Sequence, residues 1–313
     1  MRRHETVLIA YAVLLAAVVA GSVATPILLS GPNMGNLLEQ TTALGIAAIG
    51  QTLVILTAGI DLSVGSVISL TVALLSVLME GGRMAILPSL LMAMAVGALI
   101  GAINGIGITK FKIPPFVMTL GMMSVAAGAA LKIRPLPGGE IAYQLSDFLN
   151  YRIGIIPVAT MIFALLLAVC YFMLTRTKFG RNIYATGGNE RTSALSGIRT
   201  DRVKLAVYTL SGLAASLAGI YVASRMGTGD ATVGKYFTLD TVTVAVLGGI
   251  NLFGGRGSLI GIIASLFVLT TLNNILNLTG VDSFYQYVLK GLILLLVVSF
   301  YALRGRRGNA ASL

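Results

Sequence analysis

The sequence predicts an all-α, polytopic membrane protein with about ten transmembrane helices. Of its 313 residues, 56% are hydrophobic and only 11% are charged, whereas a soluble domain carries about 25% charged residues. The apolar residues form successive runs, several of them as long as the roughly 20 residues that a helix needs to cross a bilayer. We therefore expect residues 1–313 to form a single transmembrane domain.

Charged residues, glycines and prolines divide the chain into about ten apolar runs. We expect the first run to be a retained helix rather than a cleaved signal peptide, because many later runs must stay embedded. Pro26, Gly31, Pro32 and Asn33 predict a loop after it. The expected spans are 7–25, 44–59, 62–79, 86–109, 115–131, 153–174, 205–224, 239–250, 259–278 and 284–303.

The boundaries between these runs follow from a few residues. Asp61 separates the second run from the third, and residues 80–83 (Glu-Gly-Gly-Arg) predict a turn before the fourth. Lys110 and Lys112 end the fourth run, and two prolines restart the chain for the fifth. Residues 132–152 are polar and rich in proline and glycine, so we expect a loop there.

The basic residues predict which side of the membrane each loop faces. Ten spans place both termini on one side, and most of the 22 lysines and arginines lie at the termini, after the fourth run, and in 177–201 with its flanks. Because cytoplasmic loops are enriched in Lys and Arg, both termini and 177–201 are expected in the cytoplasm. The net charge of +11 therefore does not indicate nucleic-acid binding, which needs basic residues clustered on a soluble face.

Residues 177–201 form the longest polar segment of the chain. Asn189 is a good helix N-cap, and Gly197 suits the left-handed position after a helix end. Between them, residues 190–196 predict a helix of about two turns on which Leu195 shares an apolar face with Ile198. The pattern fits either a short helix that docks a partner at the membrane surface or a solvated loop.

Two glycine-rich breaks resemble each other. Residues 58–66 read A-G-I-D-L-S-V-G-S, and residues 248–254 read G-G-I-N-L-F-G; each follows an apolar run and precedes another. The run at 239–250 is also short, so we expect broken helices near 59–65 and 248–257. Broken helices at matching places in two halves indicate a transport pathway, with coincidence of turn residues as the alternative.

Polar residues inside the spans are the candidate pathway residues, because they are costly in a membrane. For Asp61 we favour a structural role, accepting hydrogen bonds from N–H groups at the start of the third span, over substrate contact. Lys290 either lines the interior or extends to the membrane surface. The spacing of Gly97, Gly101 and Gly105 favours close helix packing. Uncharged candidates for contact with a neutral solute are Gln51, Asn104, Asn273, Asn274, Asn277 and Gln286.

Several functions are disfavoured by motifs that the sequence lacks. It has no G-x-x-x-x-G-K-[ST] phosphate loop and no H-E-x-x-H metal motif, and its single histidine, His4, cannot form a histidine metal site. It has no T-V-G-Y-G filter of a potassium channel. We therefore expect no catalytic residues, metal or cofactor on this chain. A many-span protein with a patterned cytoplasmic segment fits a channel-forming subunit that a separate motor drives.

Four motifs carry a family resemblance that covers nearly the whole chain. They are V-I-L-T-A-G-I-D-L-S-V-G-S at 54–66, F-G-R-N-I-Y-A-T-G-G-N-E at 179–190 with L-S-G-I at 195–198, A-V-L-G-G-I-N-L-F-G-G-R-G-S at 245–258, and L-N-N-I-L-N-L at 272–278. The chain resembles the membrane permeases of bacterial ABC importers for ribose and related monosaccharides. That group also includes branched-chain amino acid permeases, but I-D-L-S-V-G-S is closer to the sugar branch.

The resemblance implies an inner-membrane permease that imports a monosaccharide by alternating access. It also implies four kinds of partner: a cytoplasmic ABC ATPase that binds the ATP, a periplasmic sugar-binding protein, a second permease copy (identical or homologous), and membrane lipid. Residues 191–194, Arg-Thr-Ser-Ala, depart from the acidic, alanine-rich turn usual in the family. Because of that departure, the resemblance implies that the ATPase docks here but does not specify which residues it contacts.

Combining motifs and resemblance, we assign two sets of candidate residues. The set expected to couple to the ATPase is Gly187, Gly188, Asn189, Glu190, Leu195, Ser196 and Gly197. The set expected in the translocation pathway or its gates is Asp61, Ser63, Asn104, Asn251, Asn273 and Asn274. The alternatives are a branched-chain amino acid permease, a stand-alone facilitator or channel, and a membrane scaffold, which the glycine-rich breaks and buried polar residues disfavour.

Overall fold

The computed structural model describes residues 2–82, 84–282, 284–286, 288–292 and 295, and their regular structure is almost entirely helical. The α-helices are α1 (Arg2–Ala24), α2 (Gly31–Leu56), α3 (Val64–Leu78), α4 (Ile86–Thr109), α5 (Pro115–Ile133), α6 (Tyr143–Asn150), α7 (Val158–Arg176), α8 (Lys178–Gly188), α9 (Glu190–Leu195), α10 (Thr200–Met226), α11 (Phe237–Leu247) and α12 (Leu259–Leu278). The shorter elements are η1 (Pro26–Leu29), η2 (Glu80–Gly82), η3 (Val233–Tyr236), β1 (Arg152–Ile153) and β2 (Ile156–Pro157).

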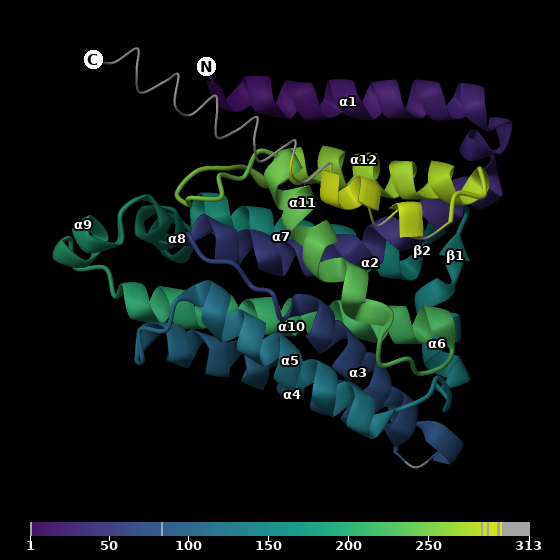
Figure 1. Cartoon of the computed structure of the whole chain (residues 1–313), viewed down its shortest axis with the longest axis horizontal. Helices are drawn as coiled ribbons and strands as arrows, with labels where there is room; N and C mark the ends of the chain where they lie inside the picture. The colour runs from purple at the N-terminus through teal and green to yellow at the C-terminus, as the bar shows by residue number, and fades with distance from the viewer. Residues whose placement is uncertain (1, 83, 283, 287, 293–294, 296–313) are drawn as a thin grey trace.

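The long helices run along the long axis of the molecule, and α10 lies between two groups of them (Figure 1). On one side it packs against α3 and α4, with α5 behind them, and on the other side against α2. Helix α12 packs against α2 and α11, and α1 covers α12. Helices α8 and α9 lie at one end of the molecule, which we call the α9 end; α6 and the β1–β2 hairpin lie at the opposite end, the hairpin end.

Small residues bring α4 and α10 into close contact. A Cβ atom at Gly97 would lie 2.5 Å from the carbonyl oxygen of Gly212, and one at Gly101 would overlap the carbonyl oxygen of Tyr208. A Cβ atom at Gly105 would lie 2.8 Å from Leu205 Cδ1 and 2.9 Å from its Cα. The predicted packing role of these glycines is confirmed, because close backbone approach is how helices associate in a membrane.

The fold class is confirmed. Five described helices are long and apolar enough to cross a membrane, namely α4, α5, α7, α10 and α12. The predicted bounds of two spans, 86–109 and 259–278, agree with α4 and α12. Helix α11 is short, as expected, and is followed by a break without regular structure at 248–258. The last expected span, 284–303, lies largely outside the described residues, so the number of ten spans stays a prediction.

Three boundaries were wrong. The expected loop around Pro32 is instead the start of α2 at Gly31, because proline is tolerated in the first helical turn, where its missing N–H has no partner to lose. The span expected from 153 begins only at Val158, since a hairpin with Gly154 in the left-handed region (φ 66°) precedes it. The expected loop at 132–152 contains the amphipathic helix α6, whose Leu145 and Leu149 are buried.

Candidate functional site

Asp61 lies in the break between α2 and α3 and is 1% exposed. Its Oδ1 accepts hydrogen bonds from the backbone N–H (3.0 Å) and the Oγ (2.6 Å) of Ser63, and its Oδ2 accepts one from Ser211 Oγ on α10 (2.8 Å). Asn104 of α4 donates from Nδ2 to Ser63 Oγ (3.0 Å). We call these four residues the Asp61 cluster. It contains the expected contact with an N–H group near the start of α3, and it ties the break to α4 and α10.

The second break has a different chemistry. Asn251 is exposed, and its Oδ1 accepts a hydrogen bond from the backbone N–H of Phe253 (3.1 Å). Its own N–H donates to the carbonyl oxygen of Arg256 (2.9 Å). Gly254, Gly255 and Gly257 of this break have positive φ. Asn251 therefore stabilises a local turn, whereas Asp61 joins separate helices.

The two neighbouring asparagines of α12 are not part of the Asp61 cluster. Asn274 and Asn33, near the start of α2, exchange two hydrogen bonds through their side-chain amides (2.9 and 3.0 Å). Since α2 has 26 residues at about 1.5 Å each, this pair and the Asp61 cluster lie near opposite ends of α2. Asn273 is half-buried beside it. The structure thus brings Asp61, Ser63 and Asn104 together but leaves Asn251, Asn273 and Asn274 elsewhere.

Some buried amide groups have no hydrogen-bond partner within the described part of the chain. Both side-chain atoms of Gln51, Oδ1 of Asn104 and Oδ1 of Asn273 are in this state. Buried polar groups in proteins nearly always have a partner, which is ordered water where no protein group is available. Gln51, Asn104 and Asn273 therefore each have a hydrogen-bonding atom that could bind water or a polar solute. Gln286 and Asn277, in contrast, bond to each other (2.8 Å).

Residues 177–201 form two helices rather than one. Helix α9 is the predicted helix: Asn189 Oδ1 accepts from Thr192 N–H (2.9 Å), and Gly197 is left-handed (φ 84°). Helix α8, which precedes it and includes Gly187 and Gly188, was not predicted. The shared apolar face was wrong as well, because Leu195 is 84% exposed whereas Ile198 packs against the core.

Charge is concentrated around α9. Lys204 of α10 bonds to Glu190 of α9 (2.6 Å), with the lysine side chain largely buried. A pocket of about 310 Å³ lies between this pair and the α4–α5 turn, with Lys112 and Asp201 also in its wall. The exposed basic residues of 177–201 and its flanks are Arg176, Lys178, Arg181, Arg191, Arg199 and Arg202. The segment therefore exposes several basic side chains as well as Leu195, and Glu190 fastens α9 to α10.

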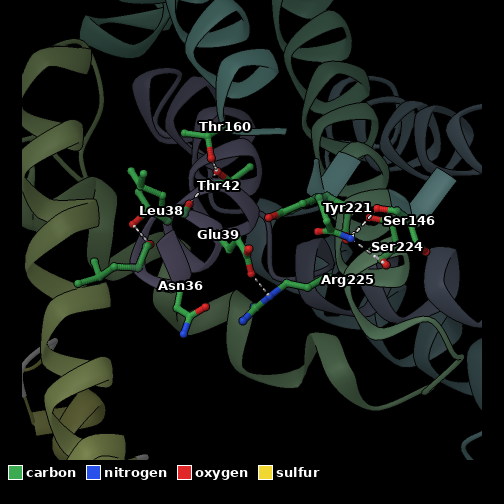
Figure 2. Close-up of polar contacts among 12 residues, drawn as sticks. Asn36, Leu38, Glu39, Thr42, Ser146, Thr160, Tyr221, Ser224 and Arg225 are labelled. Carbon is green, nitrogen blue, oxygen red and sulfur yellow. Dashed lines mark hydrogen bonds and ion pairs between the residues drawn. The ribbon is translucent and has the colours of Figure 1, made fainter. Parts of the chain in front are cut away.

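At the hairpin end, Glu39 of α2 binds two arginines, and Figure 2 shows its ion pair with Arg225. Its Oε1 lies 2.6 Å from Arg152 of β1 and its Oε2 lies 3.2 Å from Arg225 of α10. Tyr221 points toward Glu39 from α10, and its buried hydroxyl has no partner within the described residues. The ion pairs fasten the hairpin and α10 to α2, and sequence reasoning missed them because Glu39 lies just outside the expected spans.

Lys290 forms an ion pair with Asp240 in the first turn of α11 (2.8 Å), and both side chains are nearly buried. Its Nζ also lies 5.8 Å from the centroid of the Tyr236 ring. Neither alternative considered for Lys290 included this partner. The sequence did contain an indication of this pair, because Asp240 is an acidic residue in a predicted span and a buried charge needs a partner of opposite charge.

The described residues contain no group of three or more His, Cys, Asp and Glu side chains that could hold a metal ion. The candidate residues offer hydrogen-bonding groups beside two helix breaks.

Comparison with known proteins places the chain in a family. The family model described as "Branched-chain amino acid transport system / permease component" matches residues 33–298. The "Ribose import permease protein RbsC" of Bacillus subtilis (strain 168) is 40% identical over 286 residues, covering 90% of this chain and 88% of that protein.

Two further relatives carry other names. The "Fructose import permease protein FrcC" of Rhizobium meliloti is 33% identical, covering 85% of this chain and 77% of that protein. The "Xylose transport system permease protein XylH" of Escherichia coli (strain K12) is 32% identical, covering 86% and 84%. No solved structure matches this chain at a significant level. The chain belongs to the family of permease components described under branched-chain amino acid transport systems.

Proposed function

We propose that this chain is the membrane permease subunit of an ATP-driven (ABC) importer that moves a monosaccharide, ribose in the first instance, into the bacterial cytoplasm. The relatives named above are import or transport permeases for ribose, fructose and xylose, and each matches most of this chain. Branched-chain amino acids are mentioned only in the description of the broad family. The protein is a multi-pass protein of the inner membrane.

The observation that carries the ATP-driven part is α9. It is a capped helix at one end of the molecule, it exposes Leu195 in a segment with several exposed basic side chains, and Glu190 fastens it to α10. Such a helix can transmit force from a docked partner to the long helix behind it. We propose that a cytoplasmic ABC ATPase docks here and contacts Asn189, Glu190 and Leu195. The other residues of the coupling segment, which transmit the movement, are Gly187, Gly188, Ser196 and Gly197.

This assignment orients the molecule. The α9 end and both termini lie in the cytoplasm, and the hairpin end faces the periplasm, where a sugar-binding protein delivers its cargo. A second permease copy, identical or homologous, completes the transporter, and the exposed apolar faces of α4, α5 and α7 meet lipid or that copy. The excess of lysine and arginine at the α9 end supports this orientation.

We propose transport by alternating access. ATP binding draws the ATPase subunits together, α8 and α9 move with them, and α10 carries the movement to the Asp61 cluster, because Ser211 of α10 donates to Asp61. The free energy comes from different docking of the ATPase with and without ATP. The residues proposed to gate or line the path are Asp61, Ser63, Asn104, Asn251, Asn273 and Asn274. No bond to the sugar is made or broken, and the ATP is bound by the partner.

Uptake by vesicles that contain the purified complex of permease, ATPase and binding protein tests this function. We expect ATP-dependent accumulation of labelled ribose that unlabelled ribose suppresses and leucine does not. Suppression by leucine would favour the branched-chain amino acid alternative. Ribose movement through the permease alone, without ATP, would establish a facilitator and contradict the proposal.

A further inference from the structure

The two helix breaks, far apart in the sequence, meet at the C-terminal end of α8. The N–H of Gly255 donates to the carbonyl oxygen of Leu56 (3.0 Å), the last residue of α2. A Cβ atom at Gly254 would lie 2.7 Å from the backbone nitrogen of Ala58 and 2.8 Å from the carbonyl oxygen of Gly187. We call residues 56–58, 187–188 and 254–255 the backbone junction.

Gly187 occupies the centre of this junction. A Cβ atom there would overlap the carbonyl oxygen of Leu56 and lie 2.7 Å from the nitrogen of Gly255, the two atoms of the hydrogen bond between the breaks. Its φ is not positive, so space rather than backbone conformation demands glycine. The adjacent Gly188 has nothing within 4 Å of its Cβ position. The demand for glycine is therefore specific to the residue that touches both breaks.

Ala58 adds strain to the same junction. It is left-handed (φ 61°) at the end of α2, where N–H groups of Ala58 and Gly59 bond back to Ile55 and Val54 (2.9 and 3.1 Å). This hydrogen-bond pattern is a Schellman motif, which usually has glycine at this position. A left-handed alanine costs roughly 1–2 kcal/mol. Strained residues of this kind gather at sites that switch conformation.

A side-chain contact holds α8 to the second break as well, since Tyr184 Oη donates to the carbonyl oxygen of Gly257 (3.2 Å). Helix α8 is thus fastened to both breaks, whereas α9 is fastened to α10 by Glu190. Leu56 lies five residues before Asp61. A movement of α8 therefore reaches the Asp61 cluster through the end of α2, by a route separate from α10.

We propose that Gly187 is a positioning residue that holds the two breaks together under α8, so that one movement of α8 displaces both breaks at once. The inference rests on the proposed function, because an ATPase must supply the movement. Gly187 touches neither the ATPase nor the sugar in this account. Its contribution is to let ATP hydrolysis be coupled to transport, and its loss uncouples the two.

The test compares Gly187→Ala with Gly121→Ala in the complete transporter, reconstituted in lipid vesicles with ribose as the probe. Gly121 lies in α5, outside both sets of candidate residues, and nothing lies within 4 Å of its Cβ position. The measured quantity is the number of ATP molecules hydrolysed for each ribose accumulated, together with the amount of co-purifying ATPase. We expect Gly121→Ala to match the wild type. We expect Gly187→Ala to keep its ATPase but raise the ratio about fivefold or more, the lower end of typical coupling between two sites.

An unchanged ratio in Gly187→Ala overturns the inference. If that variant does not accumulate in the membrane, Ala58→Gly decides instead, since it relieves the backbone strain while loosening the same junction. We expect Ala58→Gly to keep or raise the melting temperature and still raise the ratio; an unchanged ratio again overturns the inference. Wild-type vesicles without ATP-driven ribose uptake would contradict the proposed function itself, which distinguishes the two failures.

Discussion

The two breaks are nearly alike in sequence but differ in what holds them. At 58–66 the acidic residue, Asp61, is buried and accepts three hydrogen bonds, one of them from another helix. At the matching place in 248–258, Asn251 is exposed and bonds only within its own turn. The similar sequences predict two helix breaks correctly. The neighbouring residues differ, so Asp61 bonds to another helix whereas Asn251 stabilises a local turn.

The first break is held by a buried side chain that reaches other helices, and the second by contacts of its own backbone. Asp61 orders the start of α3 and joins it to α4 and α10. The second break is built from a turn with several left-handed glycines and is linked to its neighbours mainly through its backbone.

The largest difference is expected between Asp61→Ala and Asn251→Ala. Removing the buried carboxylate leaves the hydroxyl groups of Ser63 and Ser211 without their acceptor, and each such loss costs about 1–3 kcal/mol. Removing the exposed amide of Asn251 costs less than about 1 kcal/mol. Thermal unfolding in detergent should show a clearly lower melting temperature for Asp61→Ala only. Equal shifts would contradict the contrast between the breaks.

The substitutions Asp61→Asn and Asn251→Asp change the charge of each side chain but hardly its size, so they test whether the charge matters at each break. Asp61→Asn places an NH2 group where Asp61 now accepts hydrogen bonds, so we expect a lower melting temperature and reduced uptake. Asn251→Asp keeps the oxygen that Phe253 N–H needs, so we expect both to stay near wild type. A tolerated Asp61→Asn would show that the contacts of Asp61 do not depend on its charge.

Removing the hydrogen bond between Ser211 of α10 and Asp61 should lower the melting temperature less than removing the Asp61 carboxylate does. Ser211→Ala removes one of three hydrogen bonds to Asp61 and should cost about 1.5–3 kcal/mol, the range for bonds to charged groups. Its control is Ser216→Ala on the same helix, whose hydroxyl bonds only to a carbonyl of its own helix, that of Leu213 (2.9 Å), in the described structure. Equal decreases in melting temperature for Ser211→Ala and Ser216→Ala would show that the bond from Ser211 to Asp61 adds no stability of its own.

The parts of this fold that were predictable from the sequence are those with local signals. Lysines and prolines mark the ends of α4 and the start of α5, and Asn189 with Gly197 delimits α9. The start of α2 was missed because a proline in a first helical turn reads like a loop. In each of these cases, the deciding interaction lies within a few residues.

The partners of the candidate residues could not be predicted in the same way. Ser211 is 150 residues from Asp61, and Asp240 is 50 residues from Lys290, so only the packing of the helices identifies the pairs. The same holds for Gly187, whose need for glycine comes from Leu56 and Gly255. A glycine pair in the sequence gives no indication of which member is crowded.

Docking of the ATPase on α9 can be tested by measuring the ATPase activity of the co-purified complex in lipid. The variant is Glu190→Ala with Leu195→Ala; the control is Val125→Ala with Leu165→Ala, two side chains of α5 and α7 that are each 65% exposed. We predict that the first variant loses a stable or stimulated ATPase and that the control keeps it. Full activity in the first variant would contradict the account, as would a wild-type permease that binds no ATPase and leaks ribose alone.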